Sequence, residues 1–275
     1  MIFQNKIEKK ISKDAEKKFH DKWAQLENPK TINIKLTNEA STAPEMRHIS
    51  FIIGDIKNKK ILDVGCGLGE ASIYFATKLA KVTALDLSPG MLKLTNKLAL
   101  INKVKIKTHL ATAENFKLKK SDKFDVIYAG NCLHHSNIKE TLKSISFHLK
   151  KDGIFVSWDP IAYNPIINIY RKLACKVRTI DEHPLTVSDI NLIKKNFKNV
   201  ETKYFWLLTL LIFIFMYIFQ NRDPNKERYW KAIIYEEKKW KWIYMPLEFI
   251  DKILLFLFPP LRLLCWNIVI YGVKK

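Results

Sequence analysis

Apolar and polar residues alternate along the middle of the chain in two different rhythms. Five short apolar runs have the length and composition of buried strands, and they lie at residues 60–65, 81–86, 104–110, 124–130 and 153–159. The stretches between them carry apolar residues at helical spacing, near residues 68–80, 88–102 and 137–150. This β-α alternation predicts parallel strands joined by right-handed crossovers, with helices on both faces of the sheet.

The flanking segments complete the predicted order of elements. Residues 6–28 predict an amphipathic helix, because apolar side chains recur among charged ones at Ile7, Ile11, Phe19, Trp23 and Leu26. A polar connector with breakers at Pro29 and Pro44 is expected from Asn28 to about Glu45. Two further helices are predicted at residues 160–178 and 186–197, the second with Thr186 or Ser188 as its N-cap. A sixth and a seventh strand are predicted at residues 199–208 and 265–274. The expected fold class is therefore α/β: a doubly wound, seven-stranded, mostly parallel sheet.

Three glycines follow the first predicted strand at alternate positions: Gly65, Gly67 and Gly69. Glycines between a strand and a helix leave backbone N–H groups and a positive helix end open to a ligand. The dinucleotide fingerprint has two residues between its last glycines, whereas this loop has one, which favours a ligand without a pyrophosphate. Asp86 ends the second strand, 21 residues after Gly65, where a carboxylate can bind both hydroxyls of a ribose. These features predict a site for adenosine attached to something small.

Four segments, in this order, resemble the successive motifs of class I S-adenosylmethionine-dependent methyltransferases: "ILDVGCGLGEASIYFA", "VTALDLSPGML", "FDVIYAGNCLHH" and "LKKDGIFVSWD". The resemblance covers residues 45–160 well and the rest in outline. Within the family, the subgroup with paired histidines after the fourth strand, which includes quinone and other small-molecule methyltransferases, is the most similar. The resemblance implies a Rossmann-like methyltransferase fold with S-adenosyl-L-methionine as cofactor.

The resemblance also implies roles for individual residues. Asp63 and the backbone of Gly65, Cys66 and Gly67, in the loop that Gly69 closes, are expected to hold the methionyl part of the cofactor. Asp86 is expected to hold the ribose, and Leu87 to flank the adenine. The family often has an acidic residue near the adenine amino group. Here the corresponding stretch is "ATAEN", with Thr112 at the aspartate position, so Thr112, or Ala113 with Glu114, takes that role.

The turn after the fourth strand, Asn131 to His135, faces the glycine loop in a doubly wound sheet, because the crevice opens where the strand order reverses. His134 or His135 is the candidate acceptor of a proton from the methyl acceptor, with His135 preferred because it lies nearer the next helix. The alternative is that each histidine caps a helix or packs in the core. Cys66 and Cys132 are not expected to be nucleophiles, because the cofactor itself carries the methyl group.

Residues 207–263 differ from the rest of the chain because they are rich in apolar and aromatic residues. The run 204–219 has no charge but is shorter than the ~20 residues of a spanning helix. It allows three interpretations: a core helix and strand, an interfacial or re-entrant membrane segment, or a full span. Trp and Tyr among lysines at 230–244 favour the interface. Pro259 and Pro260 break the second run, 253–264, as in a shallow hairpin.

The domain organisation expected from these patterns has three parts. Residues 1–45 form an N-terminal helix and connector, and residues 46–206 with 264–275 form the methyltransferase core. Residues 207–263 form an insertion that acts as a lid or docks on a membrane. An apolar lid at the carboxyl edge of the sheet implies an apolar acceptor, such as a lipid, a quinone or a prenylated compound. We expect a cytoplasmic protein associated with the inner face of a membrane, with membrane contact through 204–219 and 253–264.

The net charge of +20 raises nucleic acid as a partner, but only six of the 47 basic residues are arginines, so no specific nucleic-acid partner is expected. An RNA methyltransferase remains the alternative activity, and a non-catalytic, membrane-associated cofactor-binding protein the alternative class. The four cysteines, Cys66, Cys132, Cys175 and Cys265, have no metal-ligand spacing. We expect reduced thiols and no structural metal. No N-terminal secretory signal is expected, because residues 1–30 contain no uninterrupted apolar run.

Overall fold

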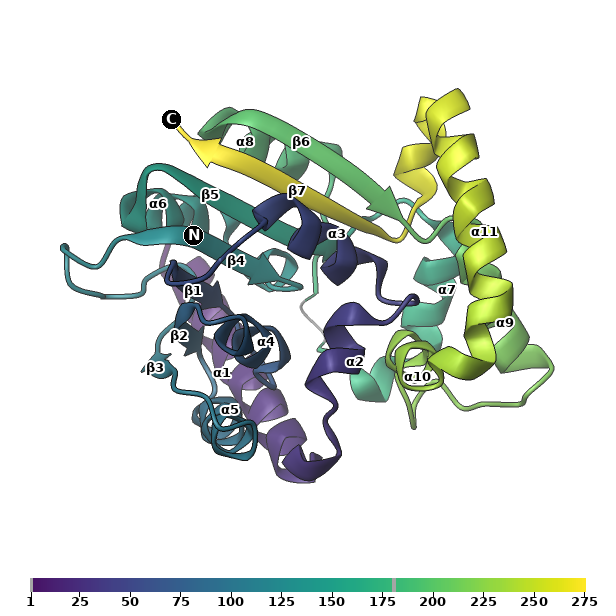
Figure 1. Cartoon of the computed structure of the whole chain (residues 1–275), viewed down its shortest axis with the longest axis horizontal. Helices are drawn as coiled ribbons and strands as arrows, with labels where there is room; N and C mark the ends of the chain where they lie inside the picture. Colours follow the sequence, from purple (N-terminus) through teal and green to yellow (C-terminus); the bar gives the residue numbers. More distant parts are fainter. Residues whose placement is uncertain (1, 180–181) are drawn as a thin grey trace.

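The computed structural model describes the backbone of residues 2–179 and 182–275, and the side chains of this part from residue 13 onward. The described residues form one seven-stranded sheet with the strand order β3-β2-β1-β4-β5-β7-β6 (Figure 1). Its strands are β1 Lys60–Val64, β2 Lys81–Asp86, β3 Lys107–Leu110, β4 Phe124–Gly130, β5 Leu149–Pro160, β6 Phe197–Phe205 and β7 Asn267–Lys274. The predicted α/β fold class is confirmed, and the predicted strands differ from these mainly at their ends.

The direction of the strands determines which edge of the sheet can hold a ligand site. Strands β3, β2, β1, β4 and β5 pair in parallel, and β7 pairs antiparallel with both β5 and β6. The order reverses between β1 and β4, so a crevice opens at the carboxyl ends of these two strands. In Figure 1 these ends point toward the group of helices at the right of the molecule.

Helices cover both faces of the sheet. Their bounds are α1 Ile2–Leu26, α2 Ile34–Glu39, α3 Pro44–Ile53, α4 Glu70–Thr77, α5 Pro89–Ile101, α6 Ile138–His148, α7 Pro165–Leu173, α8 Val187–Asn196, α9 Leu211–Ile218, α10 Tyr229–Tyr235 and α11 Glu237–Leu257. Alternate residues of a strand point to opposite faces. Ile61 accordingly packs in the apolar cluster with α3, α4 and α5, whereas Leu62 packs in the cluster with α6 and α8.

Two predicted segments differ from the structure, and part of a third cannot be compared with it. Residues 28–45 are not a plain connector, because α2 lies within them and Pro44 is the first residue of α3. Helix α7 is shorter than the predicted 160–178, since the Asn164 side chain accepts a hydrogen bond from the N–H of Ile167 and starts the helix there. The side chains of Ile7 and Ile11, part of the predicted amphipathic pattern, lie outside the described residues.

The apolar block after β6 folds as short helices against the end of the sheet. Strand β6 ends at Phe205, and the apolar run continues as a single 3-10 turn, Leu208–Leu210, and the eight-residue helix α9. Side chains of Phe213, Tyr229 and Trp240 join the same core cluster as the sheet. The interpretation of 204–219 as a full membrane span is therefore wrong, because the run divides into the end of β6, a 3-10 turn and the eight-residue helix α9.

Across the described residues, none of the helices combines the length and the apolar character needed to cross a bilayer. The division of the chain into 1–45, 46–206 with 264–275, and 207–263 stays a prediction.

Candidate active site

The loop after β1 has the backbone shape that only glycine adopts readily. Gly65 and Gly67 have φ of 71° and 51°, in the left-handed region. A Cβ at Gly65 would come within 2.6 Å of the Cys132 Sγ, so the loop and the turn after β4 touch here. A Cβ at Gly67 meets nothing within 4 Å, because this residue faces open space in the cavity. Side chains at these positions would strain the loop or fill the site.

Two buried carboxylates form the floor of the site beside this loop. Asp63 Oδ2 accepts a hydrogen bond from Ser72 Oγ at 2.6 Å, while its Oδ1 is buried and has no partner among the described residues. Asp86 Oδ2 accepts from the N–H of Gly67 at 2.9 Å, and Oδ1 from the N–H of Ser88 at 2.8 Å. Burial raises the pKa of Asp63 to about 7 and that of Asp86 to about 6. The floor therefore favours a ligand that carries positive charge and hydrogen-bond donors.

Helix α1 closes one side of the site, which the sequence did not predict. Glu16, Phe19, His20 and Trp23 line the cavity. Asp21 holds the helix in place, because its Oδ1 accepts from Ser88 Oγ at 2.5 Å and from the N–H of Gly90 at 2.9 Å. The only indication in the sequence was the presence of aromatic residues on a helix that is otherwise highly charged.

The cavity has a volume of about 250 Å³ and continues from the glycine loop toward the helices of the apolar block. Its far wall is aromatic and comes from several separate segments: Tyr128, Trp158, Tyr170, Trp206, Trp230 and Trp266. Large aromatic side chains exclude water and offer flat apolar surfaces to a ligand. The same cavity therefore joins a polar, acidic end to an apolar end.

His134 is fixed in the core at the side of the cavity. It is 3% exposed, and its Nδ1 lies 2.9 Å from Oδ1 of the fully buried Asp159. Burial lowers the pKa of His134 well below its usual range and raises that of Asp159 well above. Burial thus disfavours the charged form of both groups, and Asp159 sets the orientation of the imidazole ring.

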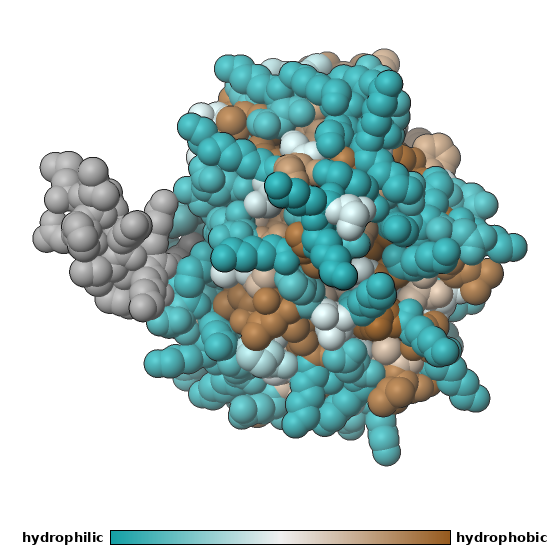
Figure 2. All heavy atoms as spheres, turned by 90° about the vertical axis from the view of Figure 1, so that its left-hand side faces the viewer, coloured by the Kyte–Doolittle hydropathy of each residue, from teal (hydrophilic) through white to brown (hydrophobic). Residues whose placement is uncertain are grey.

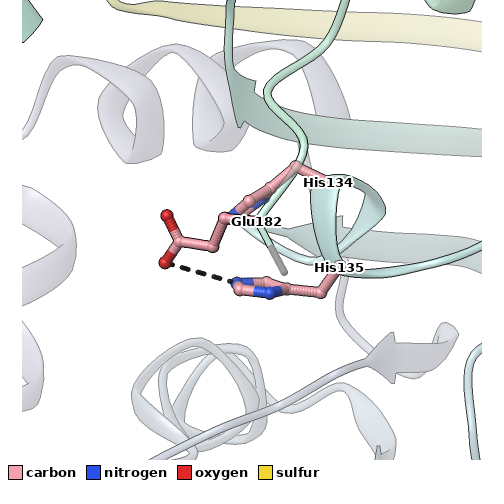
Figure 3. Close-up of side chains that lie close together, drawn as sticks. All are labelled: His134, His135 and Glu182. Atoms are coloured by element: carbon pink, nitrogen blue, oxygen red, sulfur yellow. Dashed lines mark ion pairs between the residues drawn. The ribbon is translucent and has the colours of Figure 1, made fainter. Parts of the chain in front are cut away.

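His135 is the more reachable histidine of the pair. Figure 3 shows Glu182 pointing toward it, with His134 beside it. The Nε2 of His135 lies 4.0 Å from Oε1 of Glu182, and its Nδ1 lies 3.5 Å from Oε1 of Glu16. Burial, with help from the positive charges of His20 and Lys13, lowers the pKa of His135 to about 3.

Donor atoms of His134, His135 and Glu182 all lie within 4.8 Å of one another, so these residues are also a set of potential metal ligands. Spacing gave no hint of this set, because Glu182 follows His135 by 47 residues.

The structure brings most of the predicted site residues to one cavity and leaves four outside. Those that line it are Asp63, Gly65, Cys66, Gly67, Asp86, Leu87, Asn131, His134 and His135. Those that do not are Gly69, which starts α4, and Thr112, Ala113 and Glu114. The Glu114 carboxylate instead lies 2.9 Å from Lys13 Nζ of α1 and accepts from the N–H of Asn137. The role of 112–114 in adenine binding stays a prediction.

The described residues fit the cofactor that the motifs imply. The open space at Gly67 admits a ligand against the backbone, and the unpaired Oδ1 of Asp63 is available to a donor. S-adenosylmethionine carries a sulfonium and an ammonium group, which suit two buried carboxylates. The fold and this site are those that the resemblance to class I S-adenosylmethionine-dependent methyltransferases predicts.

Comparison with known proteins agrees with this class. Residues 61–153 match the family model described as "Methyltransferase domain". The ubiquinone biosynthesis O-methyltransferase of Pelagibacter ubique is 39% identical over 100 residues, which cover 36% of this chain and 41% of that protein. The enzyme of the same name from Rickettsia akari is 28% identical over 158 residues, which cover 54% of this chain and 59% of that protein. The chain thus spans about half the length of the curated relatives that it matches.

A solved structure shows the same fold. Phosphoethanolamine N-methyltransferase 2 of Haemonchus contortus, in complex with S-adenosyl-L-methionine, superimposes with a TM-score of 0.53 over 84% of this chain and 52% of that one, at 16% identity. This likeness concerns the fold alone. With the family model and the site, it identifies residues 61–153 as a domain of the S-adenosylmethionine-dependent methyltransferase family.

Proposed function

We propose that this protein is an enzyme that transfers a methyl group from S-adenosylmethionine to a small molecule with an extended apolar part, such as a quinone or another lipid. The observation that carries the proposal is the single cavity with Asp63, Asp86 and the glycine loop at one end and aromatic side chains at the other. When bound, S-adenosylmethionine supplies an electrophilic methyl group. The protein has to orient the two partners and exclude water, which this enclosed cavity favours.

We assign each part of the cavity a role in this reaction. Asp86 holds the ribose and Asp63 the methionyl part, beside the backbone of Gly65 and Gly67. The aromatic wall holds the apolar part of the acceptor. His135, neutral at pH 7, accepts a proton from the acceptor. Glu16, whose pKa burial raises to about 7, lies 3.5 Å from the Nδ1 of His135 and in its ionised form stabilises the imidazolium that forms. Asp159 keeps the neighbouring His134 in position.

The experiment that tests the activity uses methyl-labelled S-adenosylmethionine with host extracts separated into lipid, polar metabolite, RNA and protein fractions. We expect label in the lipid fraction, and we expect Asp86→Ala to abolish it together with cofactor binding by calorimetry. The matched control is Asp152→Ala, which removes an exposed carboxylate far from the cavity. Label confined to RNA would establish the alternative activity, and no cofactor binding by the wild type would refute the proposal.

We further propose that the outer side of α11 docks on an anionic membrane surface. Three large aromatic side chains of this helix face outward, although two of its carboxylates are buried: Trp242, Phe249 and Phe256 are 83%, 64% and 79% exposed, whereas Glu248 and Asp251 are buried. The three aromatic residues are spaced by seven, so they lie along one side of the helix.

The surroundings of this stripe suit a bilayer. Lys238, Lys239 and Lys241 precede Trp242 on the same helix, the mixture of basic and aromatic residues found at a headgroup layer. Ile218 and Phe219, at the end of α9, are also more than half exposed. Helix α11 forms the right-hand edge of Figure 1, and Figure 2, seen from the opposite side, shows a mainly hydrophilic surface with small hydrophobic areas. A group of large exposed apolar side chains along one helix is typical of an interaction surface.

Vesicle co-sedimentation tests the docking surface. We expect the protein to bind vesicles of phosphatidylglycerol and phosphatidylcholine at low salt, and the triple variant Trp242→Ser, Phe249→Ser, Phe256→Ser to lose most of this binding. The control replaces Phe51 and Leu100, which are equally exposed on other helices, by Ser. Equal binding by the two variants would refute the proposal, and concentration-dependent dimerisation lost only in the triple variant would assign the surface to a second copy of the chain.

A further inference from the structure

Three arginines gather beside the acceptor end of the cavity, and the site described above does not use them. Arg178 and Arg228 line the cavity, and Arg171 lines an adjoining depression together with Arg178 and Glu182. They come from three places in the chain: the end of α7, the loop after it and the start of α10. The three positive charges are close together, because the charges of Arg171 and Arg228 both lower the pKa of Arg178.

The carboxylates in the part of the chain that the structure describes neutralise the charge of the three arginines only in part. Within residues 13–179 and 182–275, the one carboxylate that pairs with any of the three is Glu182, on Arg178. Arg228 donates to the Val177 carbonyl at 3.0 Å, and its guanidinium carbon lies 3.5 Å from the centre of the Trp23 ring. Glu27 and Glu70, the acidic groups nearest to Arg228, are engaged with Lys231 at 3.9 and 3.5 Å.

The guanidinium group of Arg171 has the fewest hydrogen-bond partners relative to its donors. Its Nη1 donates to Oδ1 of Asn168 at 2.8 Å, whereas Nε and Nη2 are buried with no hydrogen-bond partner among the described residues. Burial lowers the pKa of Arg171, Arg178 and Arg228 to about 10, so all three remain cations at neutral pH. Buried charge without a partner is costly for the folded state. A guanidinium in such a place is suited to bind an oxyanion through two parallel hydrogen bonds.

We propose that the methyl acceptor carries an anionic group, a phosphate or a carboxylate, which binds Arg178 and Arg228 while Arg171 adds positive charge behind them. This inference rests on the proposed function, since it specifies the acceptor of that reaction. The anion then lies next to the histidine proposed to accept the proton. Thr179 Oγ1, one residue after Arg178, is 3.3 Å from His135 Nδ1, and the partner of Arg178, Glu182, is 4.0 Å from His135 Nε2. The acceptor is thus an amphiphile: its apolar part contacts the tryptophans and its acidic group the arginines.

Binding of three six-carbon probes to the full chain tests this inference. Hexyl phosphate, hexanoate and 1-hexanol have apolar parts that differ by no more than one methylene group, and tryptophan fluorescence reports on the cavity because Trp23, Trp158 and Trp230 line it. We expect at least one of the two anions to bind about tenfold or more tightly than the alcohol. The stronger of the two anions shows whether the acceptor carries a phosphate or a carboxylate.

Variants then locate the binding site. Arg178→Gln and Arg228→Gln should each weaken binding of the preferred anion roughly tenfold and leave 1-hexanol binding unchanged. Arg262→Gln, which removes an exposed arginine elsewhere, should change neither. Circular dichroism verifies folding, and Arg178→Lys, which keeps the charge but not the paired donors, should give an intermediate loss.

The result that overturns the inference is equal affinity for all three probes, or unchanged anion binding in both arginine variants. Calorimetry with S-adenosylmethionine on the same wild-type sample separates this failure from that of the proposed function. Cofactor binding without anion preference refutes the acceptor assignment alone. Anion preference without cofactor binding refutes the methyltransferase proposal.

Discussion

Two carboxylates, those of Asp63 and Asp86, determine how the stability of the site depends on pH and on a cationic ligand. Asp63 and Asp86 are buried beside the glycine loop, and their pKa values rise to about 7 and about 6 because burial disfavours the charged form. In the unfolded chain both groups ionise near pH 4. Between about pH 4 and 7 the folded protein binds more protons than the unfolded one, so these groups make the free protein less stable as the pH rises. A ligand that places positive charge beside Asp63 and hydroxyl donors on Asp86 reverses this effect, because it stabilises the ionised form of both groups.

We therefore predict that stabilisation by S-adenosylmethionine grows with pH. The increase in melting temperature caused by the ligand should be small at pH 5, rise through pH 6 to 7 as Asp63 and Asp86 ionise, and level off near pH 8. Differential scanning fluorimetry with and without ligand measures it. Asp63→Asn should reduce both the shift and its pH dependence. A shift that is the same at pH 5 and pH 8 would contradict the charge assignment.

At the scale of elements, one side chain connects helix α11 to the start of the apolar block. Asp251 of α11 is 4% exposed and accepts hydrogen bonds from the N–H groups of Leu207, Leu208 and Thr209, at 3.1, 2.7 and 3.4 Å. It also accepts from Thr209 Oγ1 at 3.1 Å. These N–H groups belong to the start of the turn that follows β6. Asp251 therefore caps this turn from 42 to 44 positions away, whereas a capping side chain usually lies next to the turn in sequence.

We predict that Asp251→Ala lowers the free energy of unfolding by about 2–3 kcal/mol, because three backbone donors, that of Thr209 buried and those of Leu207 and Leu208 partly buried, lose their acceptor. Urea unfolding followed by tryptophan fluorescence measures the change. Asp251→Asn keeps one acceptor oxygen and should cost less. Asp55→Ala, at an exposed turn, serves as the control and should change stability by less than about 0.5 kcal/mol. A loss of stability no larger than that of the control would show that the capping is energetically unimportant.

At the scale of the whole molecule, helix α1 is part of the site although it lies far from the motifs in sequence. It packs on α5, and its Glu16, Phe19 and Trp23 line the cavity. The Lys13–Glu114 ion pair and the Asp21–Ser88 hydrogen bond hold it across the ends of the strands. A ligand in the cavity would contact both this helix and the glycine loop, which lie on different parts of the chain.

We predict that S-adenosylmethionine slows hydrogen exchange of α1 and of residues 65–69 together, because a ligand between them opposes opening of either. Mass spectrometry of peptides after timed exchange measures this. Helix α8 packs on the other face of the sheet and should be unaffected. Protection limited to the glycine loop, with none in residues 13–26, would show that α1 does not close over the ligand.

Much of the fold and part of the site follow from local sequence. The strands, the helices that alternate with them and the caps at Ser88 and Thr186 arise from periodicity and short-range hydrogen bonds, which neighbouring residues specify. Asp63, Gly67 and Asp86 were predictable for the same reason. Each ends or follows a strand, and the topology of a doubly wound sheet then brings these ends together.

Only the tertiary structure decided what closes the cavity. Glu45 accepts hydrogen bonds from Trp206 Nε1 at 2.7 Å and from Asn267 Nδ2 at 2.6 Å, across separations of 161 and 222 residues. Arg47 pairs with Glu248 at 2.6 Å, across 201 residues. No local pattern encodes such pairs, because they depend on how α3, the β6–β7 connection and α11 pack. The sequence by itself determined the alternation of strands and helices and the acidic floor. The aromatic wall, the cover of α1 and the arginine cluster result from long-range packing, which becomes visible only in the folded chain.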